Sequence, residues 1–464
     1  MGLHSIMAFP RTLGLDFQSS NPPRVHSFGW NCGLRNESQE YHTLHKDIKS
    51  LISREELTRY ADVYFSTVHP IFGVLDEKIF LEQVEKFWTA ELHIHSVFES
   101  ILAGTVALGS FFSNSNAHPQ EAAIVQHAKD ILEDESFPPT VDHVSGWILR
   151  TLYLRSTARP HRAWLASSTS MHLAEATGLH HEMDSMTLVE SSRSHHPPKN
   201  QKGCEQARRI FWCAWLTNIM ISYEYGRSNT VLSSISCKLP QPISGEANFT
   251  YLIISIGHLA PISGLDSAKP DVPGILEKLL KIPDQHPFIS LSKADLCMSL
   301  YRHSRLLKQP LEKDTILSIL KIGNTATTAA LSLAESQKWW WNVLCTVFQY
   351  VCVLLAIDTA ESLANVSSTM GALDKITALL GTHMAREASN TAKVLLRDSM
   401  KKKRQEVALL EKADTGQSAV DGGGVEAGGF DIDWDSLLDP WFMSQFATQE
   451  FENMMGNDGM VPTL

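Results

Sequence analysis

The sequence predicts an all-α fold, a large single multi-helix domain, on three observations. Apolar residues recur at helical spacing through most of the 464 residues, while the alternation typical of β-strands is scarce. A hydrophobic share of 43% and a charged share of 20% are ordinary for a globular protein. The composition also changes at three places along the chain. It separates a disordered, loosely ordered N-terminal segment 1–46, an all-helical domain 47–411, a flexible Gly-rich linker 412–429 and a disordered acidic tail 430–464.

The first half of the domain contains the clearest helix signals. Ser53 begins a helix, because Glu56 three residues later completes a capping box, and Pro70 ends it. Gly178 stands where the residue after a helix end is usually glycine. Amphipathic or apolar stretches predict the remaining helices of this half within 76–88, 95–112, 118–134, 137–157 and 161–183. An exposed Ser-, Pro- and Lys-rich loop follows at 190–203.

The second half continues in the same way. Helical spacing of apolar residues predicts further helices within 208–227, 293–307, 315–336, 339–360 and 382–412. Two of these runs, 208–227 and 339–360, approach the length of about 20 residues that a membrane span needs. Asn218 and Glu224 interrupt the first run, and Asn342 and Gln349 the second. We therefore interpret both as core helices and expect no contact with a membrane.

The run 208–227 could also be a DNA-contacting helix. Its arginines, however, bracket the helix and do not line one face of it. We therefore predict that Trp212 and Trp215 lie in the core. We also predict that Arg208, Arg209 and Arg227 reach polar partners at the helix ends.

Charge and cysteine usage exclude several classes of protein. A net charge of −11 argues against a chain that binds nucleic acid over its whole surface. The seven cysteines include no C-x-x-C pair, so the sequence predicts neither a zinc finger nor a disulfide framework, and favours a reducing compartment. The first residues match neither a signal peptide nor the myristoylation pattern.

No catalytic or metal-binding motif emerges from the sequence. Phosphate-binding glycine loops, a nucleophile elbow and the H-E-x-x-H pattern are all absent from it. His180, His181, Glu182 and Asp184 form the densest set of metal-capable residues. Because adjacent residues on a helix or turn point in different directions, we interpret this set as a polar helix end. We predict no catalytic residue and no metal ligand.

Two charged segments remain as candidates for interactions. Lys401, Lys402, Lys403 and Arg404 form a basic cluster late in a predicted helix, which suits either nuclear import or a solvated helix end. The tail 430–464 carries seven acids and no Lys or Arg, with large apolar residues between them. Six of these are Phe430, Trp434, Leu437, Leu438, Trp441 and Phe442.

Acidic–hydrophobic interleaving of this kind is typical of activation segments that fold into a groove of a partner. The alternative is a terminal helix that docks back on its own domain.

Three segments of the chain carry distinctive motifs. The first is a helix that ends in a His-Pro-x-Phe motif, and the second is an apolar helix that runs into Gly-Leu-His. The third has an Arg-Arg-x-Phe-Trp start, a Gly-Arg end and a strand-like run to Leu-Pro. The motif residues are His69, Pro70, Phe72, Gly178, Leu179, His180, Arg208, Arg209, Phe211, Trp212, Gly226 and Arg227. Together, over about residues 30–410, these segments resemble the regulatory domain of fungal-specific transcription factors, often called the middle homology region.

The resemblance implies a nuclear transcriptional regulator that controls a pathway or biosynthetic gene cluster and catalyses no reaction. Its helical domain would modulate activity through a small ligand or a partner. The tail would bind transcription machinery or a coactivator, and the chain would form homo- or heterodimers.

This sequence departs from the family pattern in three places. Asn218 stands where many members carry Asp, and Ser228 replaces the Pro of Gly-Arg-Pro. Family members usually carry a six-cysteine zinc cluster that places a helix on DNA, but only Cys32 lies in the first 200 residues here. Zinc is therefore expected only if such a cluster is missing from this gene model. DNA would be contacted indirectly or through the missing segment.

Two alternatives to the activator remain open. One is a co-regulator or inhibitor without zinc that dimerises with a full-length factor. The other is an all-α small-molecule-binding protein or enzyme with a deep helical pocket, which clustered buried acids or histidines would favour.

Overall fold

The computed structural model describes residues 6, 8–23, 27–35, 47–90, 96–113, 117–134, 136, 138–182, 201–242, 247–261 and 270–414. Contacts divide the chain into two units, Met1–Arg404 and Gln405–Leu464. In the second unit only 405–414, the end of the last helix, lie within these ranges. The linker residues 415–429 and the predicted activation residues of the tail therefore lie outside the described part of the chain.

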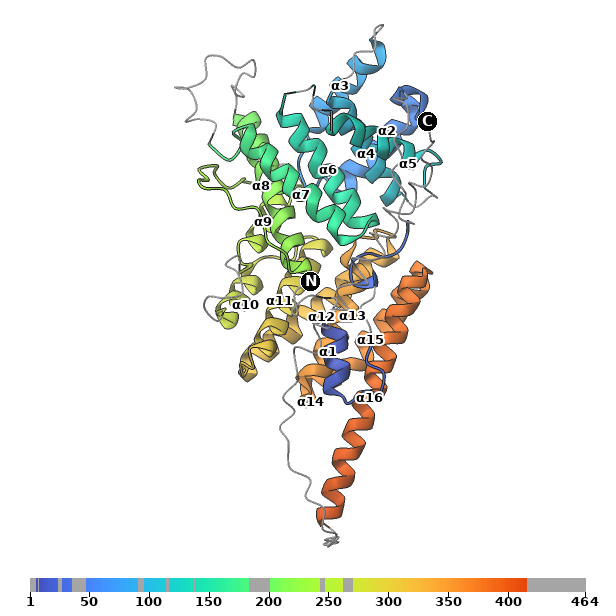
Figure 1. Cartoon of the computed structure of the whole chain (residues 1–464), viewed down its shortest axis with the longest axis vertical. Helices are drawn as coiled ribbons and strands as arrows, with labels where there is room; N and C mark the ends of the chain where they lie inside the picture. The colour runs from blue at the N-terminus through green and yellow to red at the C-terminus, as the bar shows by residue number, and fades with distance from the viewer. Residues whose placement is uncertain are drawn as a thin grey trace, which may run out of the picture. The chain divides into compact units, whose positions relative to one another are not determined.

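The predicted all-α fold is confirmed, because the described ranges contain helices and no strand (Figure 1). The run 228–240, which the family resemblance made strand-like, pairs with no strand. The α-helices are α1 (Phe9–Asp16), α2 (Arg54–Thr67), α3 (Glu77–Thr89), α4 (Phe98–Phe112), α5 (Glu121–Leu132), α6 (Val141–Thr157), α7 (Pro160–Ala176), α8 (Gln201–Tyr225), α9 (Thr250–Gly257), α10 (Val272–Lys281), α11 (Pro287–Leu306), α12 (Lys313–Glu335), α13 (Asn342–Ile357), α14 (Ala360–Ala364), α15 (Val366–Leu380) and α16 (His383–Asp414); two 3-10 turns, η1 and η2, cover Ser27–Gly29 and Ile48–Ser50.

The local signals at two helix ends work as predicted. Before α2, the Glu56 amide donates to Ser53 Oγ at 3.2 Å and the Ser53 amide donates to Glu56 Oε2 at 3.1 Å, which completes the capping box. After α7, Gly178 has φ of +75°, a conformation that costs other residues energy.

Part of the N-terminal segment 1–46 belongs to the core. Phe9 and Leu13 of α1 are buried, as are Phe28, Trp30 and Cys32. The phenyl rings of Phe28 and Phe348 of α13 meet edge to face at 4.7 Å. Residues 27–35 thus line the same core as the central helices, although no helical periodicity in the sequence announced this.

The first unit packs its helices in two groups that α8 and α11 bring together. In the first group α4 packs against α2, α5 and α6, and α6 packs against α7. In the second group α12 and α13 pack against α11 and α15. Helix α8 packs on α6, α7 and α9, and α9 in turn packs on α11 (Figure 1). All residues of α4 are buried, as expected for a helix that is apolar around its whole circumference.

The two runs of near-membrane length are core helices, as predicted. Trp212 and Trp215 of α8 are buried, and α13 buries all but the last two of its residues. Within the described ranges one helix, α12, is long and apolar enough to cross a membrane by length and composition alone. Its buried residues Ile319, Ala326, Ala330 and Leu333 recur at spacings of three, four and seven, the pattern of a helix with one face on a protein core.

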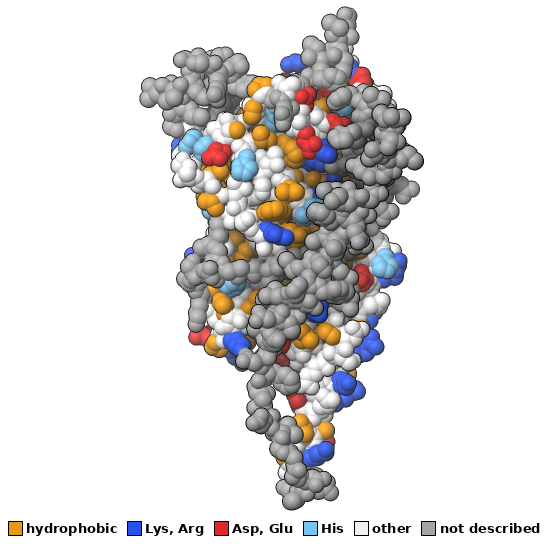
Figure 2. All heavy atoms as spheres, viewed as in Figure 1, with side chains coloured by type: hydrophobic (Ala, Val, Ile, Leu, Met, Phe, Trp, Pro, Cys, Tyr) orange, Lys and Arg blue, Asp and Glu red, His pale blue; other side chains and the backbone are white. Residues whose placement is uncertain are grey.

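Helix α16 lies on the first unit through small side chains. Ala385, Ala388, Ala392 and Leu395 are buried along one face of it. The Ser389 hydroxyl donates to the Asp374 carboxylate of α15 at 2.6 Å. Lys and Arg side chains follow the opposite, outward edge of this helix (Figure 2).

The cysteines behave as small hydrophobes. Six of the seven are buried thiols and Cys204 is half-buried. Burial raises the pKa of Cys32, Cys213, Cys237 and Cys297 to about 12, so these thiols stay protonated.

Candidate functional site

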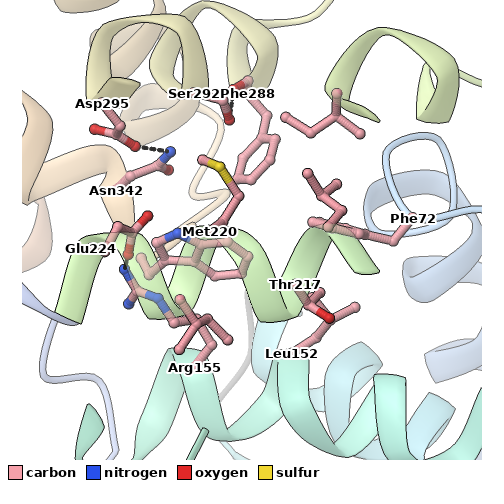
Figure 3. A pocket seen from close by; sticks show the side chains of 14 residues that line it. Phe72, Leu152, Arg155, Thr217, Met220, Glu224, Phe288, Ser292, Asp295 and Asn342 are labelled. Atoms are coloured by element: carbon pink, nitrogen blue, oxygen red, sulfur yellow. Dashed lines mark hydrogen bonds and ion pairs between the residues drawn. The ribbon is translucent and has the colours of Figure 1, made fainter. Parts of the chain in front are cut away.

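A cavity lies where the two groups of helices meet. Phe72, from the loop after α2, and Phe288 of α11 form one side of it, and Leu152 of α6 and Met220 of α8 form another (Figure 3). Apolar side chains provide most of its wall. Six polar side chains from four different helices complete the wall: Arg155 of α6, Thr217 and Glu224 of α8, Ser292 and Asp295 of α11, and Asn342 of α13.

A buried ion pair occupies one corner of the cavity. Arg155 Nη2 lies 2.6 Å from Glu224 Oε2, and Arg155 Nη1 donates to the Trp30 carbonyl oxygen. The guanidinium carbon is 3.6 Å from the Trp30 ring centroid and 5.0 Å from that of Trp341. Because Arg155 is almost fully buried, its charge depends on these partners for stabilisation. The N-terminal segment thus holds one wall of the site.

Asp295 forms the second charged corner. Its Oδ1 accepts a hydrogen bond of 2.5 Å from Thr346 Oγ1, and its Oδ2 accepts one of 3.0 Å from Asn342 Nδ2. Burial raises the pKa of this carboxyl to about 7, and the nearby charge of Glu224 adds to the effect. Asp295 therefore changes its protonation state close to neutral pH.

One polar atom of the cavity wall lacks a partner. Asn342 Oδ1 is buried and accepts no hydrogen bond within the described part of the chain. Gln349 lies one helical turn after Thr346 in α13. Its Nε2 is also buried and donates no hydrogen bond within the described residues, although its Oε1 accepts from Arg302 Nη1. An unpaired buried polar atom costs roughly 1–3 kcal/mol, so each needs an explanation such as an ordered water or a ligand.

The cavity is small in this conformation. Its lining residues surround about 430 Å³ of space that no atom fills, open solvent at the mouth included. Only about two water molecules fit inside it. Met220 points into the middle of the lining residues (Figure 3). Its unbranched, flexible side chain can move aside for a larger molecule.

The arrangement suits binding better than chemistry. A hydrogen-bond donor on a ligand would find Asn342 Oδ1 unoccupied and the Asp295 and Glu224 carboxylates nearby, with aromatic rings around its apolar part. Ser292, three residues before Asp295 in α11, also lies in the wall, but its hydroxyl donates to the Phe288 carbonyl oxygen at 2.9 Å. No group of three or more metal-capable side chains occurs in the described ranges.

The predicted metal-capable set has a structural role. Glu182 binds Arg208 of α8, with 3.1 Å between Oε1 and Nε, and its Oε2 accepts from the Lys238 amide at 2.8 Å. The His180 carbonyl oxygen accepts from the Ser236 and Cys237 amides at 3.0 Å each. We call this arrangement the motif clamp: it joins residues 180–182, residues 205–212 of α8 and residues 236–238. Asp184 lies outside the described residues.

Electrostatics agree with that role. Hydrogen bonds from Arg208 lower the pKa of Glu182, and the same contact raises the pKa of Arg208. Burial, with the neighbouring His181, lowers the pKa of His180. Glu182 and Arg208 are therefore both charged at neutral pH, and His180 is neutral.

Because α8 begins at Gln201, Arg208 and Arg209 lie about two turns inside the helix and not at its predicted start, whereas Arg227 lies just beyond its end. Arg209 lies 3.7 Å from Glu205 Oε1, so two of the three predicted polar partners are confirmed. Arg227 contacts aromatic rings instead, at 5.3 Å from the Tyr225 centroid and 6.0 Å from that of Trp164. Arg227 is exposed to solvent, so its charge needs no carboxylate partner, and the contact with these rings stabilises it.

The residues of the His-Pro-x-Phe motif line two different sites, the cavity and a surface groove. Phe72 lines the cavity, whereas His69, Pro70 and Arg209 line a separate surface groove beside Asp76. The groove is polar and mixed in charge. Leu179 and Phe211 are core residues, and Gly226 has φ of +64° just after α8.

The basic cluster at 401–404 is split by its helix. Lys401 and Arg404 are exposed. Lys402 Nζ donates to the Asp16 carbonyl oxygen at 3.5 Å, and Lys403 Nζ lies 2.7 Å from Asp358 Oδ2. Two of the four cations thus face the first unit and two face outward.

Sequence reasoning missed the cavity itself. Glu224 and Asn342 were noted only as interruptions of apolar runs, and Arg155 and Asp295 were not singled out. A polar residue inside an otherwise apolar helix was the available signal. Nothing in that signal says which of these residues meet, since they come from four helices far apart in the chain.

Comparison with known proteins places these features in context. Residues 61–282 match the fungal-specific transcription factor domain. A protein named RDR1 from Saccharomyces cerevisiae is 48% identical over 440 residues, which covers 94% of this chain and 79% of that protein. Transcription factor kojR of Aspergillus oryzae is 35% identical over 463 residues, or 95% of this chain and 82% of the other. A probable transcriptional repressor of Schizosaccharomyces pombe is 26% identical over 287 residues, covering 61% and 60% of the two chains.

Proposed function

The chain belongs to the fungal-specific transcription factor family and is a transcriptional regulator, and from that premise we propose that its helical domain binds a small apolar ligand in the cavity. The ligand carries at least one hydrogen-bond donor. The domain changes the activity of the regulator when the ligand is bound. This combines the regulator with the small-molecule-binding alternative that the sequence left open.

One observation carries the proposal. A cavity with mostly apolar walls brings together a buried ion pair, a buried carboxyl and the unpaired Asn342 Oδ1. A protein is often equally or more stable when its buried charges are replaced by apolar residues. A contribution to stability therefore does not by itself explain why this cluster is present. A donor on the ligand satisfies Asn342, and the apolar remainder fills the space that Met220 vacates.

Thermal shift of the purified full chain tests the ligand class. The probes are benzyl alcohol, which has a donor, and toluene, which has the same ring and none. A ligand that binds only the folded state raises Tm with concentration. We expect benzyl alcohol to raise Tm more than toluene at equal concentration, because only the alcohol can donate to Asn342 Oδ1.

Asn342→Leu is the matching variant, since leucine has similar size and no acceptor. It should remove the advantage of benzyl alcohol and leave the effect of toluene. Asn390→Leu, which changes an exposed amide of α16, is the control and should keep the wild-type difference. Equal shifts by both probes in the wild-type protein would count against a donor-selective site.

We further propose that the acidic tail activates transcription. The support is its composition, with Phe430, Trp434, Leu437, Leu438, Trp441 and Phe442 set among acids. Residues 413–464 fused to a foreign DNA-binding domain should activate a reporter, and Trp434→Ala with Trp441→Ala should abolish most of that activation. Asp458→Asn, outside the aromatic part, is the control. A silent fusion would favour the inhibitor or co-regulator alternative, for which a relative described as a probable repressor is a precedent.

The remaining roles follow from family membership and stay proposals. The protein acts in the nucleus, contacts transcription machinery or DNA, forms homo- or heterodimers, and catalyses no reaction. Lys401 to Arg404 would support nuclear import. The test compares a wild-type fluorescent fusion with one that carries Lys401→Ala and Arg404→Ala. If the wild-type fusion is nuclear and the variant is excluded from the nucleus, the import receptor recognises these two outward cations.

A further inference from the structure

One face of α16 carries only positive charge. The basic ridge consists of the exposed residues Arg386, Lys393, Arg397, Lys401 and Arg404. At 3.6 residues per turn their positions fall within an arc of roughly 80°. The acids of the same stretch, Glu387 and Asp398, lie roughly 100–120° from Arg386 around the helix and so leave the ridge without a carboxylate of its own.

Contacts inside the protein neutralise little of the ridge. Lys393 Nζ pairs with Asp374 at 2.8 Å, but both side chains are about half exposed, so the pair is weak. Arg386 donates to the Gly381 carbonyl oxygen and Arg397 to that of Lys393, which leaves both charges in place. Within the described residues Lys401 and Arg404 contact no acid. The ridge is therefore a local positive field on a chain whose net charge is −11.

The side chains on the ridge favour a phosphate backbone over a protein surface. Asn390 is the other exposed residue of this stretch within the same arc, Met400 lies roughly 20° outside it, and no aromatic side chain lies there. Protein interfaces are usually anchored by buried aromatic or aliphatic side chains and are poor in Lys. Phosphate contacts need only Lys, Arg and short polar side chains.

The dimensions also fit. The ridge extends over roughly 27 Å at 1.5 Å per residue, a length over which duplex DNA carries about 16 phosphates. We propose that the basic ridge of α16 contacts the sugar–phosphate backbone of DNA, independently of base sequence. It would hold the regulatory domain against the duplex while specificity comes from elsewhere. The proposal does not depend on the ligand cavity.

Salt dependence of DNA binding by the full chain tests the ridge. Anisotropy of a fluorescein-labelled 24-base-pair duplex of arbitrary sequence is measured between 50 and 200 mM KCl. The test variant is Arg397→Glu with Lys401→Glu and Arg404→Glu. The control is Lys278→Glu with Lys313→Glu and Lys321→Glu, three exposed lysines of α10 and α12 with the same charge change. Circular dichroism confirms that both variants are folded.

Each lost phosphate contact reduces the slope of log K against log salt by about 0.9. We expect the ridge variant to lose about 2.7 from the slope and to bind at least tenfold more weakly at 50 mM KCl, while the control keeps the wild-type slope. Equal losses in both variants, or no binding by the wild type, would overturn the proposal. So would displacement of DNA by a 24-residue polyglutamate at equal concentration of charge, since the ridge would then recognise acidic proteins.

Discussion

Two of the buried Arg–Glu pairs in the described part of the chain differ in what surrounds them. In the motif clamp, Glu182 takes hydrogen bonds from Arg208 and the Lys238 amide, and Arg208 also reaches Glu205 at 3.4 Å. In the cavity, Arg155 and Glu224 are equally buried, but beside them Asn342 Oδ1 has no partner within the described residues and Asp295 holds a proton up to about pH 7.

The difference separates scaffold from site. Glu182 and Arg208 are hydrogen-bonded to each other and hold three segments in place. His180 Nδ1 of the clamp also lacks a partner within the described residues, but it does not line the cavity. A polar cluster that has an unpaired acceptor beside an apolar space is stabilised by a bound molecule that donates to this acceptor. The clamp contains residues by which the family is recognised, while the cavity contains residues that no motif marked.

The largest effect is expected at the clamp. Trp212→Ala removes a buried ring and the 2.9 Å hydrogen bond from its Nε1 to the Lys238 carbonyl oxygen. We expect the free energy of unfolding to fall by about 3–5 kcal/mol, measured by urea denaturation. Leu165→Ala, at a side chain that is 55% exposed, should change it by less than about 0.5 kcal/mol. Similar values for the two variants would mean that α8 is not held as described.

The cavity should respond to pH in a direction opposite to that of the clamp. Because the pKa of Asp295 is raised from 3.8 to about 7, the folded state binds more protons than the unfolded state between these values. Stability contributed at this residue is therefore full below pH 3.8 and is lost as pH rises to 7, by roughly 4 kcal/mol at 1.36 kcal/mol per pH unit.

The asparagine in Asp295→Asn cannot ionise. The free energy of unfolding of the wild type should therefore fall relative to that of the variant as pH rises through this window. Urea denaturation at pH 4.5, 5.5, 6.5 and 7.5 measures it. Asp374→Asn, at an exposed carboxyl, is the control and should run parallel to the wild type above pH 4.5. Parallel curves for Asp295→Asn would show that its carboxyl is already ionised at low pH.

A smaller and opposite pH effect is expected from Glu182. Arg208 lowers its pKa, so Glu182 contributes stability above its unfolded pKa of about 4.5 and loses it as pH falls through the folded value. Glu182→Gln should cost about 1–3 kcal/mol at pH 7, and the gap to the wild type should close below pH 4. Glu85→Gln, at an exposed ion pair with Arg54, should cost little at either pH.

The smallest effect is expected on the basic ridge. Lys401→Ala with Arg404→Ala should change the free energy of unfolding by less than about 0.5 kcal/mol, because both side chains are exposed and contact no acid within the described residues. Thermal and urea denaturation measure this. A loss above 1.5 kcal/mol would assign the ridge to the scaffold along with the clamp.

The scaffold was largely predictable from the sequence, because its signals are local. The capping box at Ser53, the glycine at 178 and the burial of Trp212 each depend on residues within one or two helical turns. The polar contacts of Arg208 were predicted in kind, but their partner Glu182 comes from another segment. Arg227 was expected to meet a polar group and lies over rings, since side-chain stacking is not visible in spacing.

The cavity could not be predicted in the same way. Its polar residues stand alone within apolar helices, and an isolated Glu or Asn in such a helix indicates only that some partner exists. Which partner depends on how four helices cross. The contribution of Trp30 was also out of reach, because residues 27–35 follow no helical pattern and join the core by tertiary contacts.

The buried thiol of Cys32 gives this wall a chemical reporter. Cys32 Sγ donates to the Trp340 carbonyl oxygen at 3.4 Å. Cys32 follows Trp30 by two residues, and the carbonyl oxygen and ring of Trp30 contact Arg155. With its pKa near 12 and no access to solvent, it reacts with an alkylating reagent only when the segment detaches. The rate at which the native protein is alkylated at Cys32 therefore counts the openings of the cavity wall, without any label being introduced.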